Sequence, residues 1–294
     1  ESDNSRISRV IFDGNIARQN GGAIDWNSTG GNLTHTIFKN NKAQYGAALC
    51  RESKSTNGFG INNTFIANHA YIAGAGLAWM NAKGIKINNY TFQDNTSDEY
   101  GAAIFISEGS DNCVIFNSTF DNNYLTNMSD GHYGGAVCCF ADNATINVSS
   151  FNNNRANEGG AIYVGSMANQ TNVLSSNFTL HKATANGGAI ALRSSGLDIN
   201  ESYFYGNEAV YGGAVYVGGQ GESNNIYDST FDENKAIGGY GGALSWVAAG
   251  GKILYSNFTK NTADYGGGLY IAGQASESEV SHVIFKENKA VHNG

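Results

Sequence analysis

Residues 256–270 read SNFTKNTADYGGGLY, and this stretch contains both motifs that decide the fold. In the first motif two variable residues separate Phe258 from Asn261, and in the second a glycine corner leads to the aliphatic Leu269. The Phe motif occurs eleven times, at intervals of 26 to 28 residues except for one of 31, and His181 replaces the Asn in one copy. Its phenylalanines are Phe12, Phe38, Phe65, Phe92, Phe120, Phe151, Phe178, Phe204, Phe231, Phe258 and Phe285.

Two aliphatic positions repeat with the same period. One follows each glycine corner, and the other lies five residues before each Phe, where only Gly60 departs from the pattern. The first position holds Ile24, Leu49, Leu77, Ile104, Val137, Ile162, Ile190, Val215, Leu244 and Leu269. The second holds Ile7, Leu33, Ile87, Ile115, Ile146, Val173, Ile199, Ile226, Ile253 and Val280.

These short apolar segments predict strands, because they are rich in β-branched and aromatic residues and too short for helices. A unit of about 27 residues with only short strands cannot bury its own apolar face, whereas stacked copies cover one another. We therefore expect an all-β fold, a right-handed single-stranded parallel β-helix (solenoid) of about 11 coils with ~27 residues per coil. Residues 1–294 would form one such domain, a fragment of a longer chain or a processed subunit.

Stacking places equivalent residues above one another, about 4.8 Å apart. The phenylalanines should then form a column of rings in the core, and the Asn residues a ladder at a corner, where Asn tolerates left-handed backbone. A serine two residues before the Phe forms a further file, that is, a row of equivalent residues stacked along the rod, from Ser118 to Ser256. Because every coil repeats these residues, we interpret them as scaffold.

The spacing between glycine corner and next Phe alternates, so one loop is longer on every second coil. The residue after the corner aliphatic should point outward, and on longer-loop coils it is Phe105, Tyr163, Tyr216 or Tyr270, with Cys50 as the exception. These rings either pack under the longer loop or form an exposed aromatic ladder that binds sugar rings. Three tryptophans fall one residue later on the intervening coils, where alternation predicts an inward ring: Trp26, Trp79 and Trp246.

Composition narrows the possible partners. The chain has no proline, as expected for continuous sheet, and its net charge of −8 argues against nucleic-acid binding. No apolar run is long enough for direct membrane insertion. The four cysteines match no zinc spacing and the six histidines are dispersed, so we expect no metal site and no cofactor. The thiols are either free and buried or paired in disulfides.

Thirteen Asn-x-Ser/Thr sequons occur, and a glycoprotein is plausible on that ground. We expect Asn95 to be a poor acceptor, since it belongs to the inward ladder. The glycosylation candidates are Asn27, Asn32, Asn62, Asn117, Asn143, Asn169 and Asn200.

Polysaccharide lyases and hydrolases also use parallel β-helices, but they need acidic or basic groups clustered on one face. Here the acids that follow the phenylalanines lie several rungs apart, so we predict no catalytic residues. The nearest approach to a site is the irregular insertion from Tyr124 to His132, where Asp130 and His132 would project from the rod. Such a loop is either a solvated turn or a binding loop.

The combination of Phe-x-x-Asn with Gly-Gly-Ala-Ile resembles the repeats of chlamydial polymorphic outer-membrane proteins. Segments 256–263 and 265–270 are also similar to large adhesin-like surface proteins of methanogenic archaea. Either resemblance implies a β-helix displayed at the cell surface or outside the cell and used for adhesion, without catalytic residues.

We therefore expect an extracellular adhesin-like module whose partners are cell-surface glycans or proteins of another cell. A structural stalk, or a filament subunit formed by end-to-end self-association, is the alternative, because the ends of a solenoid are open sheet edges. A polysaccharide-active enzyme is a third possibility.

Overall fold

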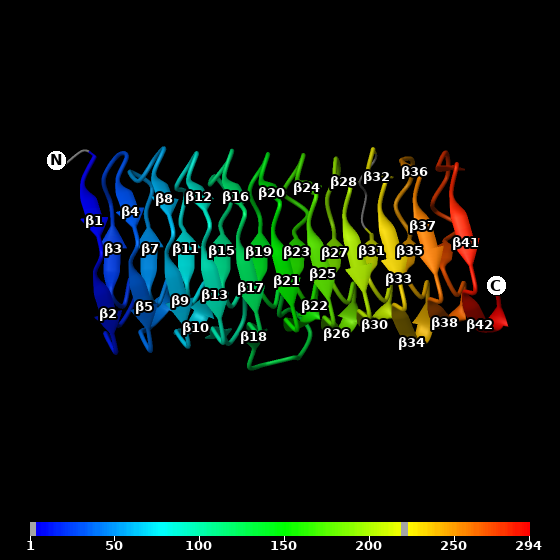
Figure 1. Ribbon diagram of the computed structural model, residues 1–294, viewed down its shortest axis with the longest axis horizontal. Helices are drawn as coiled ribbons and strands as arrows, with labels where there is room; N and C mark the ends of the chain where they lie inside the picture. The colour runs from blue at the N-terminus through cyan, green and yellow to red at the C-terminus, as the bar shows by residue number, and fades with distance from the viewer. Residues whose placement is uncertain (1–3, 219–222) are drawn as a thin grey trace.

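The computed structural model describes residues 4–218 and 223–294, and these residues form strands and loops without any helix. Forty-two short strands build four parallel sheets that wind into one elongated solenoid (Figure 1). Successive coils lie side by side along the rod from the N-terminus to the C-terminus. The predicted parallel β-helix of about 11 coils is confirmed.

Each sheet takes one strand per coil, and a full coil passes through sheets A, B, C and D in that order. Sheet A contains β1 Arg6–Ser8, β4 Asn32–Thr34, β8 Phe59–Ile61, β12 Lys86–Asn88, β16 Val114–Phe116, β20 Thr145–Asn147, β24 Asn172–Leu174, β28 Asp198–Asn200, β32 Asn225–Tyr227, β36 Lys252–Leu254 and β40 Glu279–Ser281. Sheet B contains β2 Ile11–Asp13, β5 Ile37–Lys39, β9 Thr64–Ile66, β13 Thr91–Gln93, β17 Thr119–Asp121, β21 Ser150–Asn152, β25 Asn177–Thr179, β29 Tyr203–Tyr205, β33 Thr230–Asp232, β37 Asn257–Thr259 and β41 Ile284–Lys286.

The other two sheets have ten strands each. Sheet C contains β6 Lys42–Tyr45, β10 His69–Ala73, β14 Thr96–Ser97, β18 Tyr124–Leu125, β22 Arg155–Glu158, β26 Lys182–Asn186, β30 Glu208–Tyr211, β34 Lys235–Tyr240, β38 Thr262–Tyr265 and β42 Lys289–Asn293. Sheet D contains β3 Ile24–Trp26, β7 Leu49–Arg51, β11 Leu77–Trp79, β15 Ile104–Ile106, β19 Val137–Cys139, β23 Ile162–Val164, β27 Ile190–Leu192, β31 Val215–Val217, β35 Leu244–Trp246 and β39 Leu269–Ile271.

The phenylalanines of sheet B form the predicted column of rings. Neighbouring ring centroids are 4.8 Å apart between Phe92 and Phe120 and 4.4 Å apart between Phe120 and Phe151, with nearly parallel planes. From Phe38 to Phe258 every ring of the column is fully buried. Each coil thus covers the apolar face of the next, which a single coil could not bury alone.

The Asn residues form a buried ladder directly after the Phe column. The Oδ1 atom of Asn123 accepts hydrogen bonds from the backbone N–H and the Nδ2 atom of Asn95, at 3.1 and 2.9 Å. Its own Nδ2 donates to the Phe92 carbonyl at 3.0 Å. The prediction that these Asn residues take left-handed backbone is wrong. The preceding residue has the positive φ, as in Asn122 (53°), which leaves the ladder side chain free to point inward.

The serine file forms a second ladder, in which the backbone N–H of Ser118 donates to Ser149 Oγ at 3.2 Å. Tyr90 occupies the same position one coil before Ser118, where the file begins, and its side chain is 3% exposed. A Cβ atom on Gly60 would collide with the Tyr90 hydroxyl. Gly60 therefore departs from the aliphatic pattern because the Tyr90 ring fills the space of its missing side chain.

The glycine corner connects sheet C to sheet D and uses its two glycines for different reasons. Gly187 has a φ of +62°, which is unfavourable for other residues. A Cβ on Gly188 would collide with the Gly213 carbonyl of the next coil. Gly188 thus lets the two coils approach closely at this corner, because it has no side chain.

The alternating loop length lies between sheets D and A. Five residues, 193–197, connect β27 to β28, whereas seven residues, 165–171, connect β23 to β24. The three tryptophans on intervening coils point into the core as predicted, and Trp79 and Trp246 are almost fully buried.

All four cysteines are free and buried, as one of the two interpretations predicted. The described part of the chain contains no helical segment with the length and hydropathy of a membrane span. Apolar side chains are exposed at both ends of the solenoid: Ile11, Ile16, Ile284, Phe285 and Val291. End-to-end self-association stays a prediction.

Candidate functional site

The predicted aromatic ladder is not an exposed surface in the middle of the rod. Phe105 and Tyr163 are only 8% and 6% exposed, because both pack against Phe140. Tyr163 also stacks on Tyr133, with ring centroids 4.1 Å apart. The prediction that Phe105 and Tyr163 present accessible rings is therefore wrong, and packing under neighbouring segments is the correct interpretation for these two residues.

Tyr216 and Tyr270 are half-buried, each for its own reason. The Arg193 guanidinium lies 4.9 Å from the centre of the Tyr216 ring and also pairs with Glu158. The Tyr270 ring lies 4.6 Å from that of Tyr240. Since these ring faces already have partners, the four predicted residues do not form one continuous sugar-binding surface.

A second file of tyrosines lies beside them, at the residue before the glycine corner. Tyr211 stacks on Tyr240 at 5.6 Å, and Tyr240 stacks on Tyr265 at 4.9 Å. This file was not predicted, although Tyr stands before the corner in six of ten copies. Repetition on successive coils is the signal that identifies it, and its stacked faces indicate a mainly structural role.

The insertion from Tyr124 to His132 projects from one side of the rod and overhangs sheet C (Figure 1). Thr184 Oγ1 donates a hydrogen bond to the Met128 carbonyl at 3.3 Å, which fixes the loop to β26. A groove of about 380 Å³ lies there, lined by Met128, Val210 and Ile237 and edged by Lys182. His132 bonds within the loop to Asn127 and Ser129.

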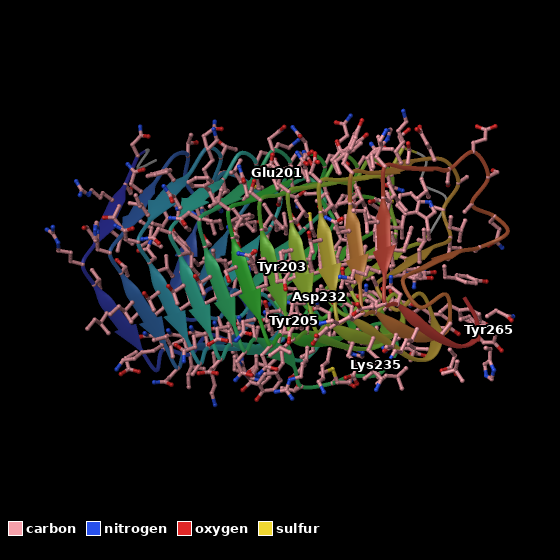
Figure 2. The ribbon with its side chains drawn as sticks, turned by 45° about the vertical axis from the view of Figure 1, so that its right-hand side comes forward. Glu201, Tyr203, Tyr205, Asp232, Lys235 and Tyr265 are labelled. Atoms are coloured by element: carbon pink, nitrogen blue, oxygen red, sulfur yellow. The ribbon has the colours of Figure 1, made fainter. Side chains whose placement is uncertain are left out.

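The exposed outer face of sheet B presents a different arrangement, which we call the tyrosine patch: Tyr203, Tyr205, Asp232, Glu233 and Lys260. Figure 2 shows Tyr203, Tyr205 and Asp232 gathered on one face of the rod. Tyr203 and Tyr205 flank the buried Phe204 on β29, so strand alternation points both rings outward. Their centroids are 6.3 Å apart and their planes differ by 7°. Tyr203 is 37% exposed.

Carboxylates border these rings. Asp232 is paired in register with Tyr205 on the next coil, and its Oδ1 atom is buried without a hydrogen-bond partner among the described residues. Tyr205 donates a hydrogen bond to Glu233 at 3.2 Å, and Lys260 pairs with the same carboxylate at 3.4 Å.

The local electrostatics follow from these contacts. Burial, followed by the nearby Asp232 charge, raises the pKa of Tyr203, and the hydrogen bond to Glu233 raises the pKa of Tyr205. Both hydroxyls therefore stay protonated at neutral pH, and the Tyr205 proton is the one donated to Glu233. The patch combines apolar ring surface, hydroxyl donors and carboxylate acceptors on a rigid strand pair.

In the sequence, the residues that follow each Phe were considered only for their acids, which lie several rungs apart. Tyr203, two residues before Tyr205, was missed as a partner. The signal was available, because residues on both sides of a buried Phe point to the same face of a strand.

The seven glycosylation candidates all lie outside the core. Asn62 and Asn200 are half-buried, and the other five have exposed side chains: Asn27, Asn32, Asn117, Asn143 and Asn169. Asn95 is fully buried in the ladder, which agrees with its exclusion. Glycosylation itself stays a prediction.

Comparison with known proteins agrees with the repeat. The model of the Chlamydia polymorphic membrane protein repeat matches residues 9–25 and 148–165, each of which contains one Phe motif and one glycine corner. The resemblance to these repeats is confirmed. The likeness to methanogen adhesin-like proteins stays a prediction.

Two curated relatives share parts of this repeat. The chain is 28% identical over 257 residues to probable outer membrane protein PmpG of Chlamydia muridarum, covering 78% of this chain and 24% of that protein. It is 30% identical over 168 residues to metabotropic glutamate receptor-like protein R of Dictyostelium discoideum, covering 55% of this chain and 10% of that protein. The chain thus spans at most about a quarter of the length of these relatives.

Among solved structures, the catalytic domain of a GH87 alpha-1,3-glucanase aligns with a TM-score of 0.35 at 10% identity. The alignment covers 94% of this chain and 64% of that domain. At this low TM-score and identity, the alignment supports no inference about the activity of this chain.

Proposed function

We propose that this chain is an adhesin-like β-helix module, displayed at the cell surface or outside the cell, that attaches to carbohydrate on another cell. A surface location is supported by the relative named as a probable outer membrane protein of Chlamydia muridarum. The solenoid supports this role physically, because a long stack of coils holds outward side chains in fixed register over several nanometres.

The tyrosine patch is the observation that carries the carbohydrate proposal. Sugar rings present apolar C–H faces that pack on aromatic rings, and hydroxyl groups that need acceptors. Tyr203 and Tyr205 supply two parallel rings, and the unpartnered Asp232 Oδ1 supplies an acceptor beside them. A bound sugar hydroxyl would satisfy this oxygen once the side chains that bury it move aside, and leaving it without a hydrogen bond is otherwise costly.

A glycan array probed with the purified chain tests the proposal. We expect a restricted set of glycans to bind, and a double variant, Tyr203→Ala with Tyr205→Ala, to lose at least tenfold in affinity for them. Tyr255→Ala is the matched control, because Tyr255 is also an exposed tyrosine (55%) but lies at the end of a sheet A strand. Its binding should equal that of the unmodified chain.

Two results would contradict the proposal. One is the absence of any bound glycan together with normal attachment of the chain to whole cells, which would favour a protein receptor. The other is unchanged glycan binding by the double variant while circular dichroism shows an intact fold.

We further propose that the patch binds its ligand without cleaving it. The Glu233 carboxylate is already held by Tyr205 and Lys260, which supports a positioning role over proton transfer. Incubation with a panel of polysaccharides should release no new reducing ends, and released product that disappears in Asp232→Asn would overturn this part of the proposal.

A further inference from the structure

Near the N-terminal end of the rod, three side chains with metal-binding atoms meet on the outer face of sheet D. Asp25 on β3 and Cys50 on β7 are paired in register on consecutive coils, and Glu52 follows β7 directly. One ligand atom from each residue lies within 4.8 Å of the other two. Residues far apart in sequence thus converge because the coils stack, which is why sequence spacing predicted no metal site.

The thiol supplies an observation that is independent of the two acids. Cys50 is fully buried and forms no hydrogen bond with any residue that the structure describes, yet its sulfur faces both carboxylates. Burial, the Asp25 charge and the Glu52 charge raise the pKa of this thiol well above its ordinary value. Burial and Glu52 also raise the pKa of Asp25. Burial is the first cause of both shifts, and the neighbouring acid charges add to it.

Space for a metal and its water ligands is available next to the cluster. A cavity of about 470 Å³ is lined by Arg18, Gln19, Asn20, Asp25 and Glu52. Asn20 Nδ2 donates a hydrogen bond to Glu52 Oε1 at 2.8 Å, and such a bond orients a carboxylate that binds a metal ion. The cavity gives an ion access from solvent, and its volume can hold the water that completes the coordination.

We propose that Asp25, Cys50 and Glu52 bind one Zn²⁺ ion, with water in the remaining position. The donor set selects this ion, because Ca²⁺ and Mg²⁺ take only oxygen ligands and Cu⁺ prefers several sulfurs, whereas Zn²⁺ accepts thiolate and carboxylate together. Zn–S and Zn–O bonds of about 2.3 and 2.1 Å require the three atoms to close by roughly 1 Å, and the solvent-accessible Asp25 and Glu52 side chains can make that movement. The ion would connect the first two coils of this chain.

The test uses the purified 294-residue chain, stripped with a chelator and titrated with Zn²⁺ or Co²⁺. We expect one Zn²⁺ per chain by elemental analysis, a thiolate-to-Co²⁺ charge-transfer band in the near ultraviolet, and a rise in Tm with Zn²⁺. Cys50→Ser should abolish the band and weaken Zn²⁺ binding at least tenfold. Serine is compatible with this position, since Ser245 occupies it on another coil.

Cys138→Ser is the matched control, because Cys138 lies in the same file and is fully buried among aromatic residues. It should leave binding unchanged. The Asp25→Asn, Glu52→Gln double variant tests the site without altering the buried position, and it should also lose the ion. Absence of the charge-transfer band from the unmodified chain, or equal Zn²⁺ binding by Cys50→Ser, would overturn the proposal. Equal loss in Cys138→Ser would do so as well.

Discussion

His181 shows how one residue can disturb a ladder that the rest of the chain repeats. It takes the place of a ladder Asn, and its Nδ1 atom accepts the Asn154 backbone N–H at 3.0 Å. The neutral ring therefore carries its proton on Nε2, and that buried atom lies near the Phe151 carbonyl without forming a well-aligned hydrogen bond. Burial lowers the pKa of His181 to about 3 from an ordinary value of 6.5.

His181→Asn should stabilise the protein, and more strongly in acid. The amide can make the ladder bonds that the imidazole lacks, which is worth about 1 kcal/mol at pH 7.5. Because the folded pKa is depressed, the unfolded state gains a proton first as the pH falls. The stability linked to the neutral His181 is fully present above pH 6.5, and it is lost progressively as the pH falls from 6.5 to 3. At pH 5 this linkage costs the unmodified chain about 2 kcal/mol, and His181→Asn removes that cost.

Urea denaturation of both proteins at pH 7.5 and pH 5 measures the effect. The exposed His282 provides the control, and His282→Asn should keep the pH dependence of the unmodified chain. If His181→Asn lost as much stability between the two pH values as the unmodified chain, burial of a neutral His181 would be refuted.

At the scale of the element, a strand of only three residues is stabilised by equivalent side chains that stack on it from the neighbouring coils. Sheet B strands contribute one buried Phe each, and the following corner contributes a ladder Asn whose bonds all run to neighbouring coils. Such a strand would be unstable alone, since isolated short strands cannot bury enough surface. The ladder explains why Asn recurs where a simple turn would accept several residue types.

Asn123→Ala should destabilise the protein by roughly 3 kcal/mol, because it removes the acceptor of the buried Asn95 backbone N–H and of one of the two Asn95 Nδ2 hydrogen bonds, and also the side-chain donor to the Phe92 carbonyl. Asn152→Ala, one coil further on, removes an exposed side chain that bonds only to Asp121, and should cost less than about 0.5 kcal/mol. Chemical denaturation midpoints compare the two. Equal losses of stability would show that the buried ladder bonds of Asn123 contribute no more than the exposed hydrogen bond of Asn152.

At the scale of the whole molecule, each coil contacts its two neighbours, and the insertion after β18 also reaches β26 two coils away. Stability should therefore spread along the rod as in a one-dimensional array. The Phe column is continuous through all eleven coils, from Phe12 to Phe285. A defect in the middle should therefore loosen adjacent coils before distant ones.

Phe151→Ala tests this coupling, because its ring stacks on Phe120 at 4.4 Å and on Phe178 at 4.9 Å. The cavity should cost about 3 to 5 kcal/mol. Hydrogen exchange followed by mass spectrometry should show faster exchange in β17–β25, with little change in β33–β41. Uniform acceleration along the chain would instead indicate a single cooperative unit.

The residues themselves determined the scaffold. A Phe at nearly constant intervals, an Asn three residues later and a glycine corner predict stacked coils, because only stacking buries so many short apolar segments. The inward tryptophans and the buried Asn95 also followed from strand alternation and repeat position.

Only the tertiary structure decided which outward side chains are free. Phe105 and Tyr163 occupy outward positions, yet segments from neighbouring coils cover them, and no repeat pattern specifies that cover. The tyrosine patch and the cluster of Asp25, Cys50 and Glu52 likewise depend on side chains from consecutive coils reaching a common point. Periodicity determines which residues share a file, whereas exposure and distance depend on rotamers and loops that differ from coil to coil.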